Sequence, residues 1–176
     1  MPLSAGTYIF EAVIPDFANF DIATMVFKPT LSVSKTSAAF SDPVNGTANP
    51  KLIPGGIAEY TITVASPSSY AVSSNSMFIS DATPANSQLI VTDFGGVGSG
   101  PAAFTAGASG LTYSFASLAS TSDGIEFSNN NGVSWTYAPS PNANGADPAV
   151  TNLRVRPQGK MAAGSSASLR LRYRVN

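Results

Sequence analysis

Oxygen-bearing side chains in one Asn- and Pro-rich segment are the chain's best candidates for binding a metal. Asp42, Asn45 and Asn49 lie close together in the sequence. Calcium takes about six to eight oxygen ligands, commonly from Asp and Asn side chains and loop carbonyls. The spacing matches no EF-hand, and the same residue types also form turns by satisfying local backbone groups. Two interpretations stay open, a calcium site or a turn, and we expect no other cofactor.

The chain has few of the side chains that enzymes commonly use for catalysis. The chain has no Cys and no His, so its many serines have no imidazole to activate them. Asp123 and Glu126 are the nearest to a carboxylate pair of the glycosidase kind. They stand three residues apart beside an expected strand, which places them on opposite faces. We therefore expect a protein that is not an enzyme.

Arginines are concentrated near the end of the chain. They hold five of the nine basic positions, namely Arg154, Arg156, Arg170, Arg172 and Arg174. No aromatic residue is interleaved on the face that carries them, and the rest of the molecule is acidic or neutral, so the pattern does not indicate nucleic acid. We interpret it as a solvated, like-charged face that discourages edge pairing. A second interpretation is electrostatic docking of an acidic segment.

The elements that position these residues alternate with a period of two, which is typical of half-buried strands. In the last segment Leu169, Leu171, Tyr173 and Val175 share one face and the arginines share the other. The same alternation predicts four further strands, over residues 31–34, 60–64, 111–115 and 153–156. No segment has the period of a helix.

Turn signals separate these runs at short intervals. Asn131-Gly132 stands between residues 125–128 and 133–137 and predicts a hairpin. Roughly ten short strands with such spacing predict an all-β fold, an immunoglobulin-like antiparallel β-sandwich. Trp135, Tyr137 and Tyr113 could form an aromatic platform, which keeps an extracellular polysaccharide-binding domain open as a third class of function.

The N-terminal arm, residues 1–29, differs from the sandwich that we expect over residues 30–176. Residues 8–14 and 22–27 are apolar on both faces, and prolines interrupt the arm. Such a segment needs cover. It either completes its own sandwich or adds a strand to another subunit. The residues expected at that subunit interface are Tyr8, Ile9, Phe10, Val13, Ile14, Phe17, Ile22, Val26 and Phe27.

Several spaced blocks resemble a known family. They are Leu31–Lys35, Asp42–Thr47, Asn49–Lys51, Ile53–Gly56, Glu59–Val64, Ile79–Asp81, Pro84–Asn86 and Ile125–Ser128. Together these resemble the conserved repeat domain of bacterial surface proteins, an immunoglobulin-like module known as domain of unknown function eleven. The resemblance covers residues 31–176. It implies an extracellular sandwich used in adhesion or surface architecture, with no catalytic residues to carry over.

Composition also bears on the function. Only 11% of the 176 residues are charged, against roughly 25% in a typical soluble domain, and a surface with few charges is prone to self-association. We expect a structural subunit of an extracellular bacterial filament in which the arm is donated to a neighbouring copy. The alternative is a monomeric cell-surface adhesion or spacer module.

The expected partner is the chain itself, with other cell-surface components open and neither nucleic acid nor membrane insertion expected. The first residues contain no basic segment of the kind that begins a signal peptide. An extracellular or cell-surface location therefore requires a leader that has been removed or lies outside this sequence.

Overall fold

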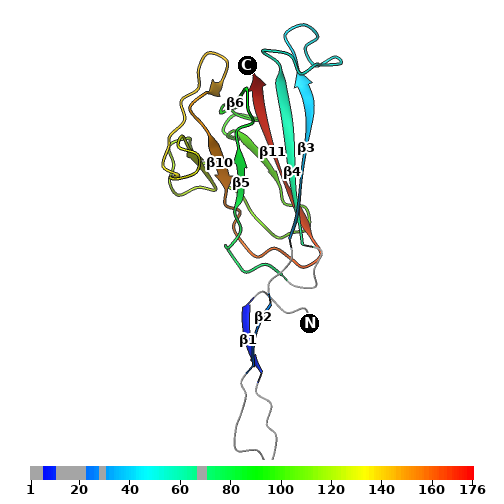
Figure 1. The fold of residues 1–176 in the computed structure, drawn as a ribbon, viewed down its shortest axis with the longest axis vertical. Helices are drawn as coiled ribbons and strands as arrows, with labels where there is room; N and C mark the ends of the chain where they lie inside the picture. Colours follow the sequence, from blue (N-terminus) through cyan, green and yellow to red (C-terminus); the bar gives the residue numbers. More distant parts are fainter. Residues whose placement is uncertain (1–5, 11–22, 28–30, 67–70) are drawn as a thin grey trace, which may run out of the picture.

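The computed structural model describes residues 6–10, 23–27, 31–66 and 71–176. These residues form antiparallel sheets and no helix, and two of the sheets pack into a β-sandwich (Figure 1). The predicted all-β sandwich is confirmed. The described residues contain no helix long and apolar enough to span a membrane.

Eleven strands are present along the described chain. They are β1 (Gly6–Phe10), β2 (Ala23–Phe27), β3 (Ser32–Ser41), β4 (Ile57–Ala65), β5 (Ile79–Ala82), β6 (Ser87–Ile90), β7 (Ala102–Thr105), β8 (Ile125–Ser128), β9 (Ala146–Asp147), β10 (Asn152–Val155) and β11 (Ser166–Val175). The larger sheet has the order β3-β4-β11-β6-β9, and β7 also pairs with β11. The smaller sheet has the order β5-β10-β8.

The alternation of β11 explains its central place in the larger sheet. Leu169, Leu171 and Tyr173 are fully buried on its inner face, and β4 pairs with the strand along almost its whole length. From the smaller sheet, Phe127 and Leu153 point into the same core. The rings of Tyr60 and Tyr173 meet edge to face with their centroids 5.3 Å apart. Apolar side chains of both sheets thus form one core.

Strand β3 is formed as predicted, but its exposure differs from the expectation. Residues 31–34 were expected to turn their apolar side inward, yet Leu31 and Val33 are exposed. Almost all of β3 is exposed on both faces. The reason is its position, because β3 ends the larger sheet and reaches past the core.

Two predicted strands are largely irregular. In residues 111–115 a single bridge joins Thr112 to Gln158, and in residues 133–137 a single bridge joins Tyr137 to Phe127. The turn between β8 and the second of these segments is present, with positive φ at Asn131 and Gly132. Side-chain alternation requires only an extended backbone, whereas a ladder also requires a partner strand beside it.

Strands β1 and β2 form a sheet of their own. They pair antiparallel, with Tyr8 opposite Met25 and Phe10 opposite Ala23. Neither strand belongs to the two sheets of the sandwich, and Figure 1 shows the hairpin beyond one end of the sandwich. The described part of the arm is therefore a two-stranded hairpin.

Candidate functional site

The loop predicted to hold calcium is organised around one carboxylate. Asp42 Oδ1 accepts hydrogen bonds from the backbone N–H groups of Val44 and Asn45, at 2.7 and 2.6 Å. Its Oδ2 accepts from Asn45 Nδ2 and from Lys51 N, at 3.1 and 2.6 Å. These hydrogen bonds, with that of the Asn45 backbone the strongest, lower the pKa of Asp42 to about 2.

The third predicted ligand of this loop faces a cation. Asn49 Oδ1 accepts a hydrogen bond from Lys51 Nζ at 3.3 Å, and Asn49 has a φ of 55°, a turn conformation that Asn tolerates. Of the three predicted ligands, Asp42 and Asn45 are therefore hydrogen-bonded to each other, whereas the side chain of Asn49 is hydrogen-bonded to Lys51. Among the described residues, no three His, Cys, Asp or Glu side chains gather as metal ligands would. The geometry matches the turn interpretation.

The two carboxylates weighed as a glycosidase pair have separate structural contacts. Asp123 accepts hydrogen bonds from the backbone of Ala116 and of Ile125, at 2.9 and 3.2 Å. Glu126 is ion-paired with Arg154 and Arg156. Burial opposes ionisation of Glu126, but the hydrogen bonds and charges of the two arginines outweigh it and lower its pKa. Both carboxylates hold local structure.

Four of the five arginines, all except Arg174, fall into two groups on different sheets. We call the first the β10 cluster, and it consists of Phe78, Glu126, Trp135, Arg154 and Arg156. The Arg154 guanidinium carbon lies 4.5 Å from the centre of the Trp135 ring, and both arginines lie 5.4 Å from the Phe78 ring. Phe78 is 52% exposed. The cluster is a cation–aromatic surface with an acidic residue at its centre.

The second group, the β11 cluster, consists of Phe40, Glu59, Phe94, Arg170 and Arg172. Arg172 Nε pairs with Glu59 at 3.0 Å, and Arg170 pairs with the same carboxylate at 3.2 Å. The Arg172 guanidinium carbon lies 3.7 Å from the Phe40 ring centre and 4.0 Å from that of Phe94. Arg172 Nη1 also donates to the Phe94 carbonyl at 3.0 Å.

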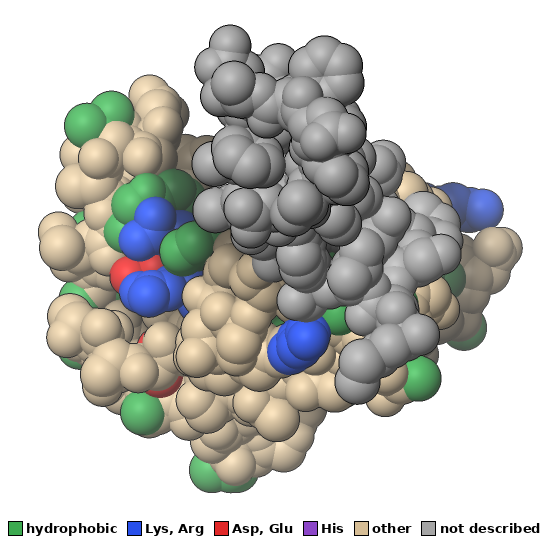
Figure 2. All heavy atoms as spheres, turned by 90° about the horizontal axis from the view of Figure 1, so that it is seen from below, with side chains coloured by type: hydrophobic (Ala, Val, Ile, Leu, Met, Phe, Trp, Pro, Cys, Tyr) green, Lys and Arg blue, Asp and Glu red, His purple; other side chains and the backbone are tan. Residues whose placement is uncertain are grey.

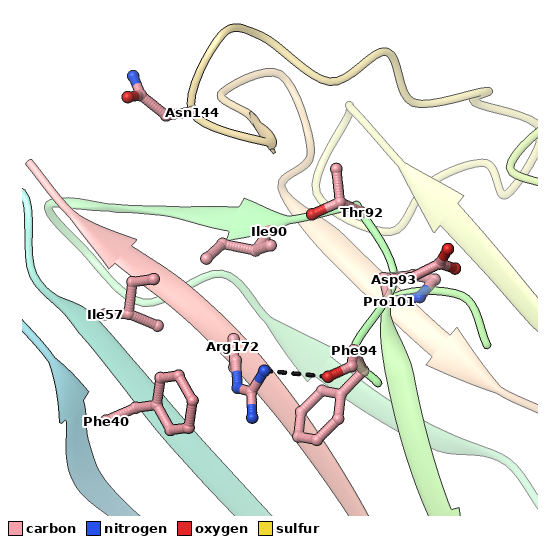
Figure 3. A pocket seen from close by; sticks show the side chains of 9 residues that line it. All are labelled: Phe40, Ile57, Ile90, Thr92, Asp93, Phe94, Pro101, Asn144 and Arg172. Atoms are coloured by element: carbon pink, nitrogen blue, oxygen red, sulfur yellow. Dashed lines mark hydrogen bonds between the residues drawn. The ribbon is translucent and has the colours of Figure 1, made fainter. Parts of the chain in front are cut away.

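A pocket of about 200 Å³ adjoins the β11 cluster. Figure 3 shows Phe40, Phe94 and Arg172 on one side of it, and the apolar side chains Ile57 and Ile90 nearby. The sequence analysis did not predict this pocket, because its residues come from segments far apart in the chain. At this pocket Arg172 Nε donates to Glu59 and Arg172 Nη1 donates to the Phe94 carbonyl.

The interpretation of the arginines as one solvated edge face is wrong. β11 is an inner strand of the larger sheet, paired on both sides, and β10 belongs to the other sheet. The expected lack of aromatic neighbours is also wrong, since Phe40, Phe78, Phe94 and Trp135 reach the arginines from other segments. Figure 2 shows such a mixture of basic, acidic and hydrophobic side chains on one part of the surface.

The three aromatic residues weighed as a polysaccharide platform do not share one surface. Trp135 and Tyr137 line the same small depression, and the Tyr137 hydroxyl donates to Asp147 at 2.9 Å. Tyr113 packs on Phe104 with ring centroids 5.9 Å apart, and its hydroxyl is buried. The structure therefore brings two of the three together and leaves the third partly buried against the core.

The residues expected at a subunit interface lie only partly within the described chain. Tyr8, Ile9 and Phe10 belong to β1, and Val26 and Phe27 belong to β2. The other four lie outside the described residues, namely Val13, Ile14, Phe17 and Ile22. The hairpin brings residues 6–10 and 23–27 side by side.

The fold defines the chain as an all-β antiparallel sandwich protein with a separate N-terminal hairpin. No protein-family model matches the chain, and no curated protein or solved structure is significantly similar to it. The resemblance of residues 31–176 to the bacterial surface repeat domain therefore stays a prediction.

Proposed function

We propose that the chain is a structural subunit of an extracellular bacterial filament. In this proposal the N-terminal arm of one subunit adds a strand to the sandwich of the next. A donor on one part of the subunit and an acceptor on another make a heterologous contact, which propagates into a fibre unless it closes into a ring.

One observation supports this proposal above the others. β1 and β2 pair with each other and belong to neither sheet of the sandwich, although the sequence of the arm is apolar on both faces. A two-stranded hairpin is at best marginally stable alone in water, and exposed apolar surface favours association. A neighbouring subunit would supply a sheet to which the arm could add.

The carboxylates of the sandwich favour a structural role over a chemical one. Each of its seven acidic residues holds a loop or pairs with a neighbouring side chain, namely Asp42, Glu59, Asp81, Asp93, Asp123, Glu126 and Asp147. These contacts of the carboxylates within the fold are typical of a structural protein.

Electron microscopy of the intact chain and of a variant without residues 1–27 tests the proposal. We expect fibres from the intact chain and monomers from the truncated one. A variant without residues 1–5 keeps both strands of the hairpin and serves as the matched control, which should still form fibres. If the intact chain stays monomeric at every concentration by light scattering, the monomeric spacer or adhesion module replaces the filament subunit.

A further inference from the structure

The inner face of β3 lies outside the core of the sandwich. In the register of β3 with β4, Val33 stands opposite Val64 and Lys35 opposite Ile62. Cross-strand partners share a face of the sheet, so both β3 residues are on the inner side. Val64 and Ile62 are buried, whereas Val33 is 66% exposed. The core therefore ends between β4 and β3.

Strand β5 borders the same side of the sandwich from the smaller sheet. Asp81 of β5 is 8% exposed, and it accepts a hydrogen bond from Tyr173 of β11 at 2.9 Å. The same carboxylate is ion-paired with Lys35, whose side chain thus links the two sheets at this margin. Among the described residues, β5 pairs with β10 alone. Its other edge and the inner face of β3 lie on one margin of the sandwich.

One added strand could pair with the free edge of β5 and also cover the exposed inner face of β3. Neighbouring strands in a sheet lie about 4.8 Å apart and packed sheets about 10 Å apart. A strand paired with the free edge of β5 would extend the smaller sheet beneath β3. Its side chains on one face would then contact Val33 and the aliphatic part of Lys35.

We propose that this margin, between the free edge of β5 and the inner face of β3, receives the N-terminal arm of a second copy of the chain. The inference rests on the proposed function and names its acceptor site. Main-chain hydrogen bonds to β5 would hold the arm, and its alternate apolar side chains would cover Val33.

Length and charge favour the arm as the occupant. Residues 8–14 are apolar with one acidic residue, Glu11. Seven extended residues reach about 23 Å, enough to pass the whole of the four-residue β5 and to stay within the length of the ten-residue β3. Residues 1–29 have three acidic residues and one basic residue, Lys28, whereas residues 30–176 have eight basic and seven acidic residues. The arm and the sandwich therefore have opposite net charge.

Cross-linking tests the acceptor site directly, because the chain has no cysteine of its own. Val33→Cys places a benzophenone-maleimide probe on the inner face of β3, and Ser34→Cys places it on the outer face of the same strand. Each labelled protein is mixed with unlabelled, isotopically heavy chain, assembled, illuminated and digested. We expect the Val33→Cys probe to link to heavy peptides from residues 1–27 at least about tenfold more than the Ser34→Cys probe, because adjacent residues of a strand face opposite sides of the sheet.

The outcomes separate the acceptor site from the proposed function. If fibres form and the Val33→Cys probe captures no heavy arm peptide, this acceptor is wrong while the filament survives. If the Val33→Cys probe links only to light peptides of its own arm, and no fibres form, both proposals fall. Charge variants at the same positions give an independent measurement, with Val33→Glu slowing fibre growth about tenfold and Ser34→Glu changing it little, because a carboxylate facing the acidic arm repels it.

Discussion

Two tyrosine hydroxyls lie inside the sandwich and differ in what they contact. Tyr173 is fully buried and donates to Asp81 Oδ2 at 2.9 Å, and burial raises its pKa well above the ordinary value. The buried hydroxyl of Tyr113 has no hydrogen-bond partner among the described residues, and burial and the charge of Asp123 raise its pKa. The same group is thus satisfied at one position and unsatisfied at the other.

Paired Tyr→Phe substitutions should therefore have opposite effects on stability. Tyr173→Phe removes a donor from a buried carboxylate, and we expect it to lower the free energy of unfolding by about 1–3 kcal/mol. Tyr113→Phe removes a polar group that lacks a partner, and we expect no loss, or a gain of up to about 1 kcal/mol. Urea unfolding measures both. Equal losses in the two variants would contradict this account of the hydroxyls.

Asp42 should make stability depend on pH in the acid range. Its pKa is about 2 in the fold against an ordinary 3.8, so its carboxylate stabilises the folded state above about pH 4 and ceases to do so as pH falls toward 2. We expect Asp42→Asn to lower the urea midpoint at pH 7, and the difference from the unsubstituted chain to shrink between pH 5 and pH 2.

Val44→Ala is the control for this pH series, because Val44 is in the same loop and its side chain is exposed. Its midpoint should follow that of the unsubstituted chain at every pH. A difference between Asp42→Asn and the unsubstituted chain that stays constant from pH 7 to pH 2 would show that the carboxylate charge is not the cause.

At the scale of elements, carboxylates and glycines shape the loops together. Asp93 accepts hydrogen bonds from the backbone N–H groups of Gly98 and Gly100, at 2.9 and 2.8 Å. Both glycines have positive φ, 82° and 68°, a conformation that other residues adopt only with strain. The loop between β6 and β7 is thus closed around one side chain by two residues that need to be glycine.

The same two glycines differ in the space around them, which gives a matched pair of substitutions. A Cβ at Gly100 would lie 2.5 Å from Phe115 Cγ, whereas a Cβ at Gly98 would meet no atom within 4 Å. We expect Gly98→Ala to cost about 1–2 kcal/mol from backbone strain. Gly100→Ala should cost about 1–3 kcal/mol more, because its methyl group overpacks the loop.

Thermal unfolding of the two variants under one set of conditions measures the difference between them. The comparison cancels the effect of the positive φ, which the positions share, and leaves the contact with Phe115. Equal melting temperatures for the two variants would mean that Phe115 moves aside without cost.

The sequence predicted the elements where side chains alternate along a full-length strand. β4 and β11 are nine and ten residues long, enough for the period to be read. β6 and β7 have four residues each, whose apolar and polar side chains do not alternate, and β9 has only two residues, so these strands were not predicted. The equally short β10, with four residues, alternates and was predicted. The clusters around Glu59 and Glu126 were missed because they depend on which strands become neighbours. The alternation of side chains along one strand does not predict which other strand will lie beside it.

At the scale of the whole molecule, the arginines show why a local pattern was not enough. Arg154 and Arg170 follow the same alternation, but β10 and β11 belong to different sheets. The chain crosses from one sheet to the other between them, which separates an apparent ladder into two clusters. Each cluster places two arginines on one glutamate and on aromatic rings. The order of the strands in the sheets is needed to tell that the arginines of β10 and β11 lie on two surfaces and not on one.

The same sheet order bears on how the arm relates to its own sandwich. The buried apolar core within residues 31–66 and 71–176 is formed by positions between Ala58 and Tyr173, and β1 and β2 belong to neither of its sheets. We therefore expect removal of residues 1–27 to change the free energy of unfolding of the dissociated subunit by less than about 1 kcal/mol. Urea unfolding followed by Trp135 fluorescence, at concentrations where the intact chain is monomeric, measures the change.

The arm either completes its own sandwich or serves a neighbouring subunit, and the two hypotheses differ most in the stability that they predict for the truncated subunit. If the arm completed its own sandwich, its removal would uncover apolar side chains and cost several kcal/mol, since burying each large one contributes about 1.5–3 kcal/mol. If the arm serves a neighbour, the truncated subunit keeps its stability and loses only its ability to assemble. A large loss of stability in the truncated monomer, with assembly of the intact chain absent, would assign the arm to its own sheet.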